Sequence, residues 1–437
     1  MSSTIFNIKA VKIQSNRREF IRKASFAGLG MFMFPDLVRK VAASDRLRVA
    51  HIGLGGMGNS HMRWFAALPE VDIVALCDVD QEHLDATMKT LQILRPGNKA
   101  QAYKDFRHIL DRKDIDAITC ATPDHWHSQI ANLAFKAGKD VYGEKPLSQD
   151  VKGGQEMLRN LNRYDRVFQL GTQIHASDNY HRVVELVRSG ILGKIHTARI
   201  WKTGSPPDLG PATYQKAPPN LDWNMWLGPA PLTEYAPQRC HFNWRYFSDY
   251  GGGVFGDFWS HIADVVYWSV QPKGLKTISA RGERAEGITD VAKWIDVDYE
   301  YDNLNIFWTS QPPNVPGAAR RGIGAYFEGE NGTLLCDYNS HEVRIGGELV
   351  ADLTKVPITL ERSPGHQQNF VNAVKSRTQP ESNLEYAREL TLPMQLGLIS
   401  YQLGRKLNWN DKREKFIGDR EATSLLSREK RKEWDLD

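Results

Sequence analysis

The sequence contains few of the features that would assign the chain to a disulfide-stabilised or a membrane-spanning class. Its 437 residues include only four cysteines, Cys77, Cys120, Cys240 and Cys336, and their spacing is not that of a metal site. A chain of this length buries a core without disulfides, so Cys77 and Cys120 are expected to be small buried side chains. The apolar run at residues 24–34 is too short to cross a bilayer. We therefore predict no disulfide scaffold, no metal site and no stable membrane span.

An excess of positive charge is also missing from most of the chain. The formal net charge is +4, but residues 1–43 hold eight Lys or Arg and two Asp or Glu. That segment therefore carries +6, and the remaining residues carry −2. A slightly negative body gives no support for nucleic-acid binding. The apolar content of 41% and the charged content of 25% are typical of a globular protein, and the length predicts two or three domains.

The basic residues at the N-terminus resemble an export signal. Residues 16–23 read N-R-R-E-F-I-R-K, similar to the S/T-R-R-x-F-L-K consensus of twin-arginine signal peptides. The apolar run and the small residues 41–43 follow, as a cleaved signal requires. We expect residues 1–43 to be this signal and the protein to be periplasmic; the alternative is an uncleaved basic anchor. Because the twin-arginine route exports folded proteins, a nucleotide would leave the cytoplasm already bound.

The body of the chain begins with a strand followed by a glycine-rich turn. Residues 49–52 are apolar, and Gly53, Gly55 and Gly58 follow with the spacing G-x-G-x-x-G. These glycines allow, in order, a tight turn, the approach of a pyrophosphate to the backbone, and close packing of the next helix. A second strand at residues 72–77 ends on Asp78, about where an acid reaches the ribose hydroxyls. The features predict a dinucleotide site that prefers NAD to NADP, because Asp78 would repel a 2′-phosphate.

Strands and helices alternate from residue 44, which predicts an NAD-binding Rossmann domain over residues 44–170. This is a doubly wound parallel sheet of an α/β fold, with helices on both faces. The expected strands are residues 49–52, 73–77, 100–103, 117–121, 140–143 and 167–171. The expected helices are residues 59–68, 80–94, 105–112, 127–137 and 151–163. The loops after the fourth and fifth strands lie at the carboxyl edge of the sheet, where ligands bind.

The pattern changes after residue 171. A helix at 180–189 and a strand at 194–201 precede an irregular stretch, 203–253, and so long a loop is more often functional than idle. Period-two alternation then predicts a large, open, mostly antiparallel sheet (residues 277–282, 294–301, 305–310, 325–330, 333–338 and 343–345). Helices at 366–375 and 384–403 are expected to close this α+β substrate-binding domain, residues 171–410. In the charged tail, 411–437, residues 420–433 form either a helix packed on the first domain or a solvated segment.

Two short stretches carry the residues from which we expect chemistry. E-K-P at residues 144–146 places Lys145 at the sheet edge, and a glycine-rich turn opens a helix that contains Asp257 and His261. Residues four apart share one face of a helix. Oxidation of a carbinol requires a group that takes the hydroxyl proton as hydride leaves, and a His/Lys pair with an orienting acid can do this. The spacing alone leaves open a solvated lysine and an ordinary Asp/His pair on a helix surface.

The combination of E-K-P with D-x-x-x-H resembles the Gfo/Idh/MocA family over nearly all of the chain beyond the signal. The resemblance implies an NAD(P)-dependent oxidoreductase that acts on CH–OH groups, with Lys145, Asp257 and His261 as its catalytic group. It implies that NAD is held by Gly53, Gly55, Gly56, Met57, Gly58, Asp78, Thr122, Pro123, His127, Glu144 and Lys145. Family substrates are sugars, cyclitols and their derivatives. The expected partners are a small carbohydrate and, because family members often associate, further copies of the chain.

The chain departs from one exported branch that it also resembles, the NAD-dependent α-N-acetylgalactosaminidases. Their helix motif resembles Y-P-T-H, whereas this chain has Phe258 at the tyrosine position, preceded by Asp257. This departure favours an oxidoreductase over a glycosidase that acts by transient oxidation of the sugar. A nucleotide-binding sensor without turnover is a third hypothesis, and the complete Lys145, Asp257 and His261 set argues against it.

Candidate substrate contacts come from the aromatic stretch and the strand before it. Trp244, Arg245 and Lys202 are the residues we expect to touch a sugar. Tryptophan and tyrosine side chains in residues 223–268 suit either core packing or stacking on sugar rings, and the sequence does not separate the two.

Overall fold

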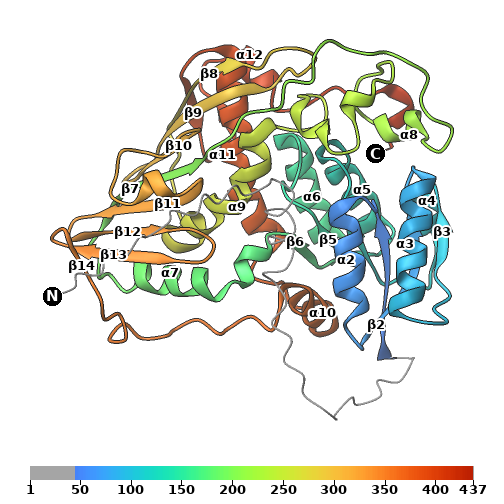
Figure 1. Cartoon of the computed structure of the whole chain (residues 1–437), viewed down its shortest axis with the longest axis horizontal. Helices are drawn as coiled ribbons and strands as arrows, with labels where there is room; N and C mark the ends of the chain where they lie inside the picture. The colour runs from blue at the N-terminus through green and yellow to red at the C-terminus, as the bar shows by residue number, and fades with distance from the viewer. Residues whose placement is uncertain (1–44, 437) are drawn as a thin grey trace, which may run out of the picture. The chain divides into compact units, whose positions relative to one another are not determined.

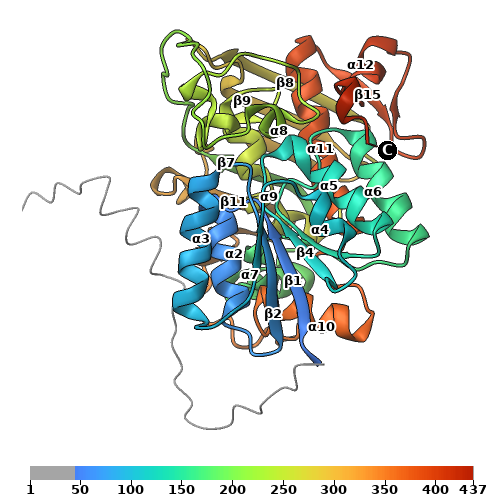
Figure 2. The same ribbon diagram turned by 90° about the vertical axis from the view of Figure 1, so that its right-hand side faces the viewer.

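The computed structural model describes residues 45–436, so the predicted signal at residues 1–43, with Arg17 and Arg18, lies outside the described residues. Within the described part of the chain, no helix is both long enough and apolar enough to cross a membrane. These residues form two β-sheets with their covering helices, seen from two directions in Figure 1 and Figure 2.

The first sheet is a six-stranded parallel sheet in the order β3-β2-β1-β4-β5-β6. Its strands are β1 (Leu47–Ile52), β2 (Val71–Cys77), β3 (Gln101–Tyr103), β4 (Ala117–Cys120), β5 (Asp140–Gly143) and β6 (Phe168–Leu170). Every residue of β4 and of β5 is buried, as expected where helices cover both faces. The strand order reverses between β1 and β4, and ligands of such sheets bind at the carboxyl ends of the strands beside this point. The predicted Rossmann sheet is confirmed.

Five helices connect these strands, and local capping fixes where some of them begin. They are α2 (Gly56–Ala66), α3 (Gln81–Leu94), α4 (Arg107–Asp111), α5 (Asp124–Lys136) and α6 (Val151–Arg163). The Asp80 side chain accepts a hydrogen bond from the Glu82 backbone N–H and starts α3, and Asp150 accepts one from the Gly153 N–H and starts α6.

The second sheet has ten strands in the order β14-β13-β12-β11-β7-β10-β9-β8-β15-β16 (Figure 1). Its pairs are antiparallel except for β7 with β10, so the predicted large, mostly antiparallel sheet is confirmed. The strands are β7 (Ile195–Lys202), β8 (Thr277–Arg284), β9 (Ala292–Glu300), β10 (Asn305–Thr309), β11 (Ile323–Gly329), β12 (Gly332–Cys336), β13 (His341–Ile345), β14 (Glu348–Leu349), β15 (Leu407–Asn410) and β16 (Lys415–Phe416).

Helix α9 (Gly253–Val270) is the central helix beside this sheet. It packs against α7 (Asp178–Arg188), α11 (Leu384–Leu403) and strand β7. Because other elements surround α9, most of its residues are apolar and buried, and the fully buried Trp259 donates its indole N–H to the Leu390 carbonyl at 2.6 Å. The core therefore fixes the position of α9, whose first turns carry Asp257 and His261.

Helix α10 (His366–Ser376) packs on a different sheet from the one the sequence pattern predicted. Phe370 lies edge-on to Phe65 and to Tyr142, with ring centroids 6.1 and 5.7 Å apart, and belongs to the core of the first sheet. The expectation that this helix closes the second domain is therefore wrong. An amphipathic pattern shows that a helix has an apolar face but does not show which sheet covers it.

The tail and the irregular stretch also contain elements that the pattern did not predict. The tail contains β16, the short helix α12 (Arg420–Ser424) and the buried Trp434, whose ring meets Trp126 of α5 edge-on at 5.5 Å. Trp434 and backbone contacts such as that of the Lys152 N–H with the Leu426 carbonyl, not a long helix, therefore pack the described tail on the first domain. Residues 203–253 include helix α8 (Trp223–Leu227) and two short 3-10 helices, η3 (Pro237–Arg239) and η4 (Asn243–Tyr246).

Candidate active site

The glycine-rich turn joins β1 to α2 and leaves space where a phosphate would lie. Gly53 has a φ of +81°, and a Cβ there would lie 2.6 Å from the Ala121 carbonyl oxygen. A Cβ on Gly58 would lie 1.8 Å from the Gly53 carbonyl oxygen, so Gly58 packs behind the turn. Among the described residues, apart from chain neighbours, no atom lies within 4 Å of the Cβ position at Gly56, and at Gly55 the one such atom is a ring carbon of His83 at 3.9 Å. Because the first amides of α2 have no partners within the helix, this turn fits a pyrophosphate.

A cavity of about 540 Å³ extends from this turn to α9. It is lined by residues of the first sheet's carboxyl edge, of α9 and of the irregular stretch. The predicted site residues along it are Gly53, Gly55, Gly56, Met57, Asp78, Thr122, Pro123, Glu144, Lys145, Trp244, Arg245, Asp257 and His261. Segments more than 200 residues apart in the sequence thus form one continuous site of the size expected for a cofactor with a substrate.

Asp78 is held at the end of β2 by the backbone of two neighbouring loops. Its Oδ2 accepts the Leu54 N–H at 2.6 Å, and its Oδ1 accepts the Asp80 N–H at 2.8 Å. Each carboxylate oxygen has a second lone pair, so the group can still accept hydrogen bonds from hydroxyl groups in the cavity. The position and charge of Asp78 fit a ribose.

Lys145, Asp257 and Arg245 form a charged group at the other end of the cavity. Lys145 Nζ donates to Asp257 Oδ1 at 2.6 Å and to the Asp257 backbone carbonyl at 3.1 Å, and Arg245 Nε lies 3.3 Å from Asp257 Oδ1. Burial alone would raise the pKa of Asp257, but Lys145 and then Arg245 overcome that effect and lower it well below the ordinary value. Asp257 is therefore a permanent anion that fixes the Lys145 ammonium in the cavity.

His261 lies one helical turn beyond Asp257 and lines the same cavity. Burial, together with the positive charge of Lys145, lowers the pKa of His261 to about 4. Its ring is 5.5 Å from the Phe258 ring and 6.4 Å from the Tyr338 ring, measured between centroids. At neutral pH, His261 is an uncharged imidazole that can accept a proton.

Glu144 supports the lysine loop from behind. Its Oε1 accepts a hydrogen bond from His61 Nε2 of α2 at 2.7 Å, in a buried pair. Burial would raise the pKa of Glu144, but this hydrogen bond and the positive charges nearby lower it instead. The pair joins the helix that follows the glycine turn to the loop that carries Lys145.

Three predicted site residues do not line the cavity. Gly58 lies behind the turn, and the buried His127 places one ring nitrogen 2.7 Å from the Pro146 carbonyl oxygen and the other 3.0 Å from the Thr122 carbonyl oxygen. Lys202 places its ammonium over the Phe258 ring, 4.7 Å from the centroid, and donates to the Thr203 carbonyl. His127 therefore joins two cavity loops from outside, and Lys202 contacts Phe258, which lines the cavity.

The cavity also contains residues that the sequence reasoning missed. His83 and His241 lie near the Asp78 end, Phe242 lies against Arg245, and Trp126 and Trp226 form part of the wall. The buried Asp124 does not line the cavity, but it interacts electrostatically with Lys145 and Asp257. Burial raises the pKa of Asp124 to about 8. The only sequence signal for these residues was the length and aromatic content of residues 203–253 and the polar stretch after β4.

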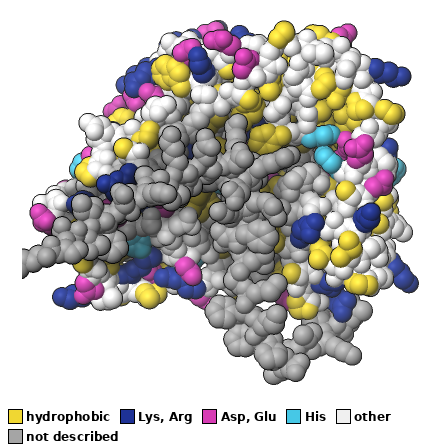
Figure 3. All heavy atoms as spheres, viewed as in Figure 1, with side chains coloured by type: hydrophobic (Ala, Val, Ile, Leu, Met, Phe, Trp, Pro, Cys, Tyr) yellow, Lys and Arg dark blue, Asp and Glu magenta, His cyan; other side chains and the backbone are white. Residues whose placement is uncertain are grey.

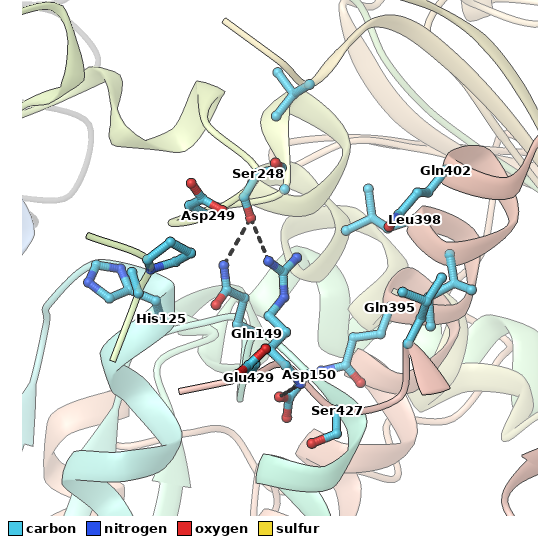
Figure 4. A pocket seen from close by; sticks show the side chains of 18 of the residues that line it. His125, Gln149, Asp150, Ser248, Asp249, Gln395, Leu398, Gln402, Ser427 and Glu429 are labelled. Carbon is cyan, nitrogen blue, oxygen red and sulfur yellow. Dashed lines mark hydrogen bonds between the residues drawn. The ribbon is translucent and has the colours of Figure 1, made fainter. Parts of the chain in front are cut away.

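A larger cavity of about 780 Å³ lies elsewhere, against α5, α6 and α11, and holds none of the predicted site residues. Figure 4 shows its polar lining, where Gln149 donates to the Ser248 carbonyl at 3.1 Å; Arg428 donates to the same oxygen at 2.9 Å. Acidic and basic residues are also interspersed on the described part of the face drawn in Figure 3. The glycine turn and the charged group both lie in the smaller cavity, which is therefore the candidate active site.

Two family models match the chain. Residues 47–172 match "Oxidoreductase family, NAD-binding Rossmann fold", and residues 182–436 match "Oxidoreductase family, C-terminal alpha/beta domain". A glycosyl hydrolase family 109 protein of Shewanella pealeana is 28% identical over 204 residues, 41% of this chain and 44% of that protein. The myo-inositol 2-dehydrogenase of Thermotoga maritima is 27% identical over 177 residues, 40% of this chain and 48% of that protein. The chain thus spans less than half the length of these curated relatives.

Solved structures show the same fold at low identity. The WlbA dehydrogenase of Bordetella pertussis, in complex with NADH and UDP-GlcNAcA, gives a TM-score of 0.62 at 16% identity, covering 84% of this chain and 99% of that one. Levoglucosan dehydrogenase, in complex with NADH and L-sorbose, gives 0.59 at 18% identity, covering 83% and 99%. Since the second family model alone matches more than half of the residues, the chain belongs to the Gfo/Idh/MocA oxidoreductase family, and residues 47–172 are its NAD-binding domain.

Proposed function

We propose that the protein oxidises or reduces a hydroxyl-bearing carbon of a sugar, glycoside or cyclitol with NAD, and that Lys145, Asp257 and His261 are its catalytic residues. One observation carries the proposal. A lysine, a carboxylate that is largely buried with it, and a neutral imidazole line the cavity that also contains the glycine turn and Asp78. A structural ion pair alone would not require an uncharged histidine beside it.

The three side chains divide the proton chemistry between them. In oxidation, the substrate C–H bond breaks as a hydride leaves, and its O–H proton must go to a base. NAD, when bound, accepts the hydride. The neutral His261 imidazole takes the hydroxyl proton, and the Lys145 ammonium donates a hydrogen bond to the substrate oxygen while negative charge develops there. Asp257 holds the Lys145 side chain in place through their 2.6 Å contact, and in reduction the proton moves from His261 to the substrate oxygen.

The substrate class is supported by the wall of the cavity and by the relatives. Trp244 and Phe242 flank the Arg245 guanidinium, which lies 4.4 and 4.7 Å from their ring centroids. Flat aromatic faces beside charged donors suit a polyhydroxylated ring. Among the similar proteins, two are dehydrogenases named for myo-inositol and levoglucosan.

The test begins with the nucleotide. Purified protein is denatured, the released nucleotide is identified by its mass and absorbance, and the native protein is then incubated with a panel of sugars and cyclitols. The expected result is NAD or NADH in the supernatant and substrate-dependent NADH formation. Turnover of a hydroxyl substrate that persists unchanged in His261→Ala would disprove the proposed base, and the absence of any nicotinamide nucleotide would disprove the cofactor.

A second candidate function is glycoside cleavage through transient oxidation of the sugar, which requires a nucleotide that stays bound. Similarity to family 109 glycosyl hydrolases favours it, and so do backbone contacts at the Asp78 end of the cavity. Residues 220–222 bond to this edge of the first domain: Gln81 N–H donates to the Asn220 carbonyl at 2.9 Å, and Asp222 N–H donates to the Val79 carbonyl at 3.1 Å. An aryl glycoside separates the candidates, because a glycosidase releases the aglycone without accumulating NADH.

We further propose that the protein is exported by the twin-arginine route. The support is the N-R-R-E-F-I-R-K sequence at residues 16–23. Replacing Arg17 and Arg18 together with lysine keeps the charge and removes both guanidinium groups. Cell fractionation should then find the double variant in the cytoplasm and the native protein in the periplasm. Equal export of both would reject this route.

A further inference from the structure

A cluster of three potential metal ligands lies at the Asp78 end of the cavity. Asp80 and His83 come from the start of α3, and His241 comes from the segment between η3 and η4. One ligand atom from each of these residues lies within 4.8 Å of the others. We propose that Asp80, His83 and His241 bind a divalent transition-metal ion of the zinc type. The proposal does not depend on the proposed function, because none of these residues belongs to the catalytic group.

The distances suit a small ion. His241 Nε2 lies 2.8 Å from Asp80 Oδ2, and the rings of His83 and His241 have centroids 4.4 Å apart. Ligands at about 2.0–2.2 Å around a tetrahedral zinc ion are separated by about 3.3–3.6 Å. Small rotations of two partly exposed imidazoles therefore bring all three atoms to bonding distance, with the proton between His241 and Asp80 displaced to solvent.

The surrounding residues already orient two of the ligands. Asp80 Oδ1 accepts hydrogen bonds from the Glu82 N–H at 2.8 Å and from the Asn220 amide at 2.9 Å, so Oδ2 is the oxygen that faces His241. His83 Nδ1 lies 3.7 Å from Asp78 Oδ2, which leaves Nε2 for a metal. A carboxylate behind one histidine nitrogen is the usual arrangement when the other nitrogen binds a metal.

The donor set selects the class of ion. Two imidazole nitrogens and one carboxylate oxygen suit zinc and its transition-metal neighbours, whereas magnesium and calcium prefer oxygen donors alone. Asp80 is buried, but His241 is exposed and His83 is half-buried, so an ion can enter from solvent. Three protein ligands leave a fourth position for water.

The sequence did not indicate this site because its ligands are not a local motif. His241 follows Asp80 by 161 residues, and the irregular stretch brings the two together. A bound ion would therefore connect α3 to the segment before η4. The hydrogen bond between Asp80 and His241 makes this connection without metal.

The test is a zinc titration of the full chain, measured by isothermal titration calorimetry. The protein has no affinity tag and keeps the nucleotide it carries. We expect one saturable site in the native protein, with affinity about tenfold or more weaker in His83→Gln and in His241→Gln. Glutamine keeps the size of the side chain and removes the imidazole. His108→Gln is the matched control, because His108 is exposed on α4 away from the cluster, and it should bind zinc as the native protein does.

Thermal unfolding of each variant, measured without metal, checks that the loss of binding is not a loss of fold. Magnesium at the same concentration should give no saturable binding. The proposal is overturned if zinc binds to no saturable site, if both glutamine variants bind it as tightly as His108→Gln does, or if magnesium binds with equal affinity.

Discussion

The two ends of the candidate active site differ in how far they are removed from water. At the catalytic end, defined by Lys145, Asp257 and His261, the charged groups are largely buried and joined by short contacts. At the Asp78 end, which also holds His83 and His241, the histidines are partly exposed and the acids bind backbone amides. Burial strengthens electrostatic interactions, which suits chemistry, and backbone hydrogen bonds fix geometry, which suits binding. The comparison predicts that substitutions affect turnover at one end and nucleotide binding at the other.

The largest effect is expected from the loss of either Lys145 or His261, the two residues proposed to act on the substrate hydroxyl. Lys145→Ala and His261→Ala should each lower turnover by about 10²-fold or more, because each removes a positioned group from the chemical step. The double variant should lose little more than either single variant if the two residues act as one unit. Steady-state kinetics measures this, and Lys99→Ala and His108→Ala, both at exposed positions, should retain native turnover.

The amount of NAD bound to each purified variant distinguishes the catalytic end of the cavity from the Asp78 end. His261→Ala should retain its NAD, since that side chain belongs to the catalytic end. Additive losses in the double variant would show two independent roles, and a His261→Ala protein without nucleotide would show that the two ends are not separate in function.

The next effect in size concerns the choice of nucleotide. Asp78→Asn keeps the shape of the side chain but removes the charge that would repel a 2′-phosphate, so the preference for NAD over NADP should fall by about tenfold. Binding constants for the two nucleotides measure the ratio. Asp72→Asn, on the same strand and outside the cavity, should leave it unchanged. A native protein that binds NADP as tightly as NAD would contradict the role given to Asp78.

The sequence indicated the residues of short motifs, at both ends of the cavity, but not the histidine that reaches the Asp78 end from a distant segment, and the reason is the range of the contacts. Gly53, Gly55 and Lys145 lie in short motifs whose chemistry is local, and β1 to β6 follow from alternating strands and helices. By contrast, His241 contacts Asp80 because residues 203–253 fold back against the first domain. No local pattern encodes that return.

The same limit applies to packing. The side of the first sheet that α10 covers depends on Phe370 meeting Phe65 and Tyr142, residues about 230 to 300 positions away. The parallel pairing of β7 with β10 likewise joins strands that are far apart in the sequence, within a sheet whose other strands pair antiparallel. Periodicity indicates which face of an element is apolar, and pairing partners are decided by the whole fold.

A smaller effect is expected at the wall of the cavity. Trp244→Ala should raise KM for a sugar substrate by about two- to tenfold with little change in kcat, because it removes an aromatic face and leaves the proton-transfer groups in place. Lys202→Ala should change KM by less, since the Lys202 ammonium lies over Phe258 outside the cavity. A larger effect for Lys202 than for Trp244 would reverse the assignment of the sugar-binding wall.

The smallest expected effect is the acid limb of the rate profile, and it compares the two ends directly. His261, with a pKa of about 4, is still mainly neutral at pH 5, so the rate of alcohol oxidation should fall only by about a tenth between pH 7 and pH 5. A histidine base with the ordinary pKa of about 6.5 would lose more than about tenfold over the same range. At the Asp78 end the shift is opposite, because the Asp78 carboxylate, 3.7 Å from His83 Nδ1, raises the pKa of His83. Histidine resonances followed by NMR should therefore show His83 charging well before His261.

The lowered pKa of His261 also predicts how stability depends on pH. Between about pH 6.5 and pH 4 the unfolded chain binds a proton at this histidine and the folded chain does not, so stability must fall as the pH falls through that window. His51, His125 and His366 act in the same direction, because burial lowers the pKa of each to between about 3 and about 4. The free energy of unfolding should therefore fall less between pH 7 and pH 5 in His261→Gln than in the native protein. If the variant shows the same pH dependence, or if oxidation loses tenfold by pH 5, then His261 titrates as a solvated histidine and the catalytic end is not shielded from water.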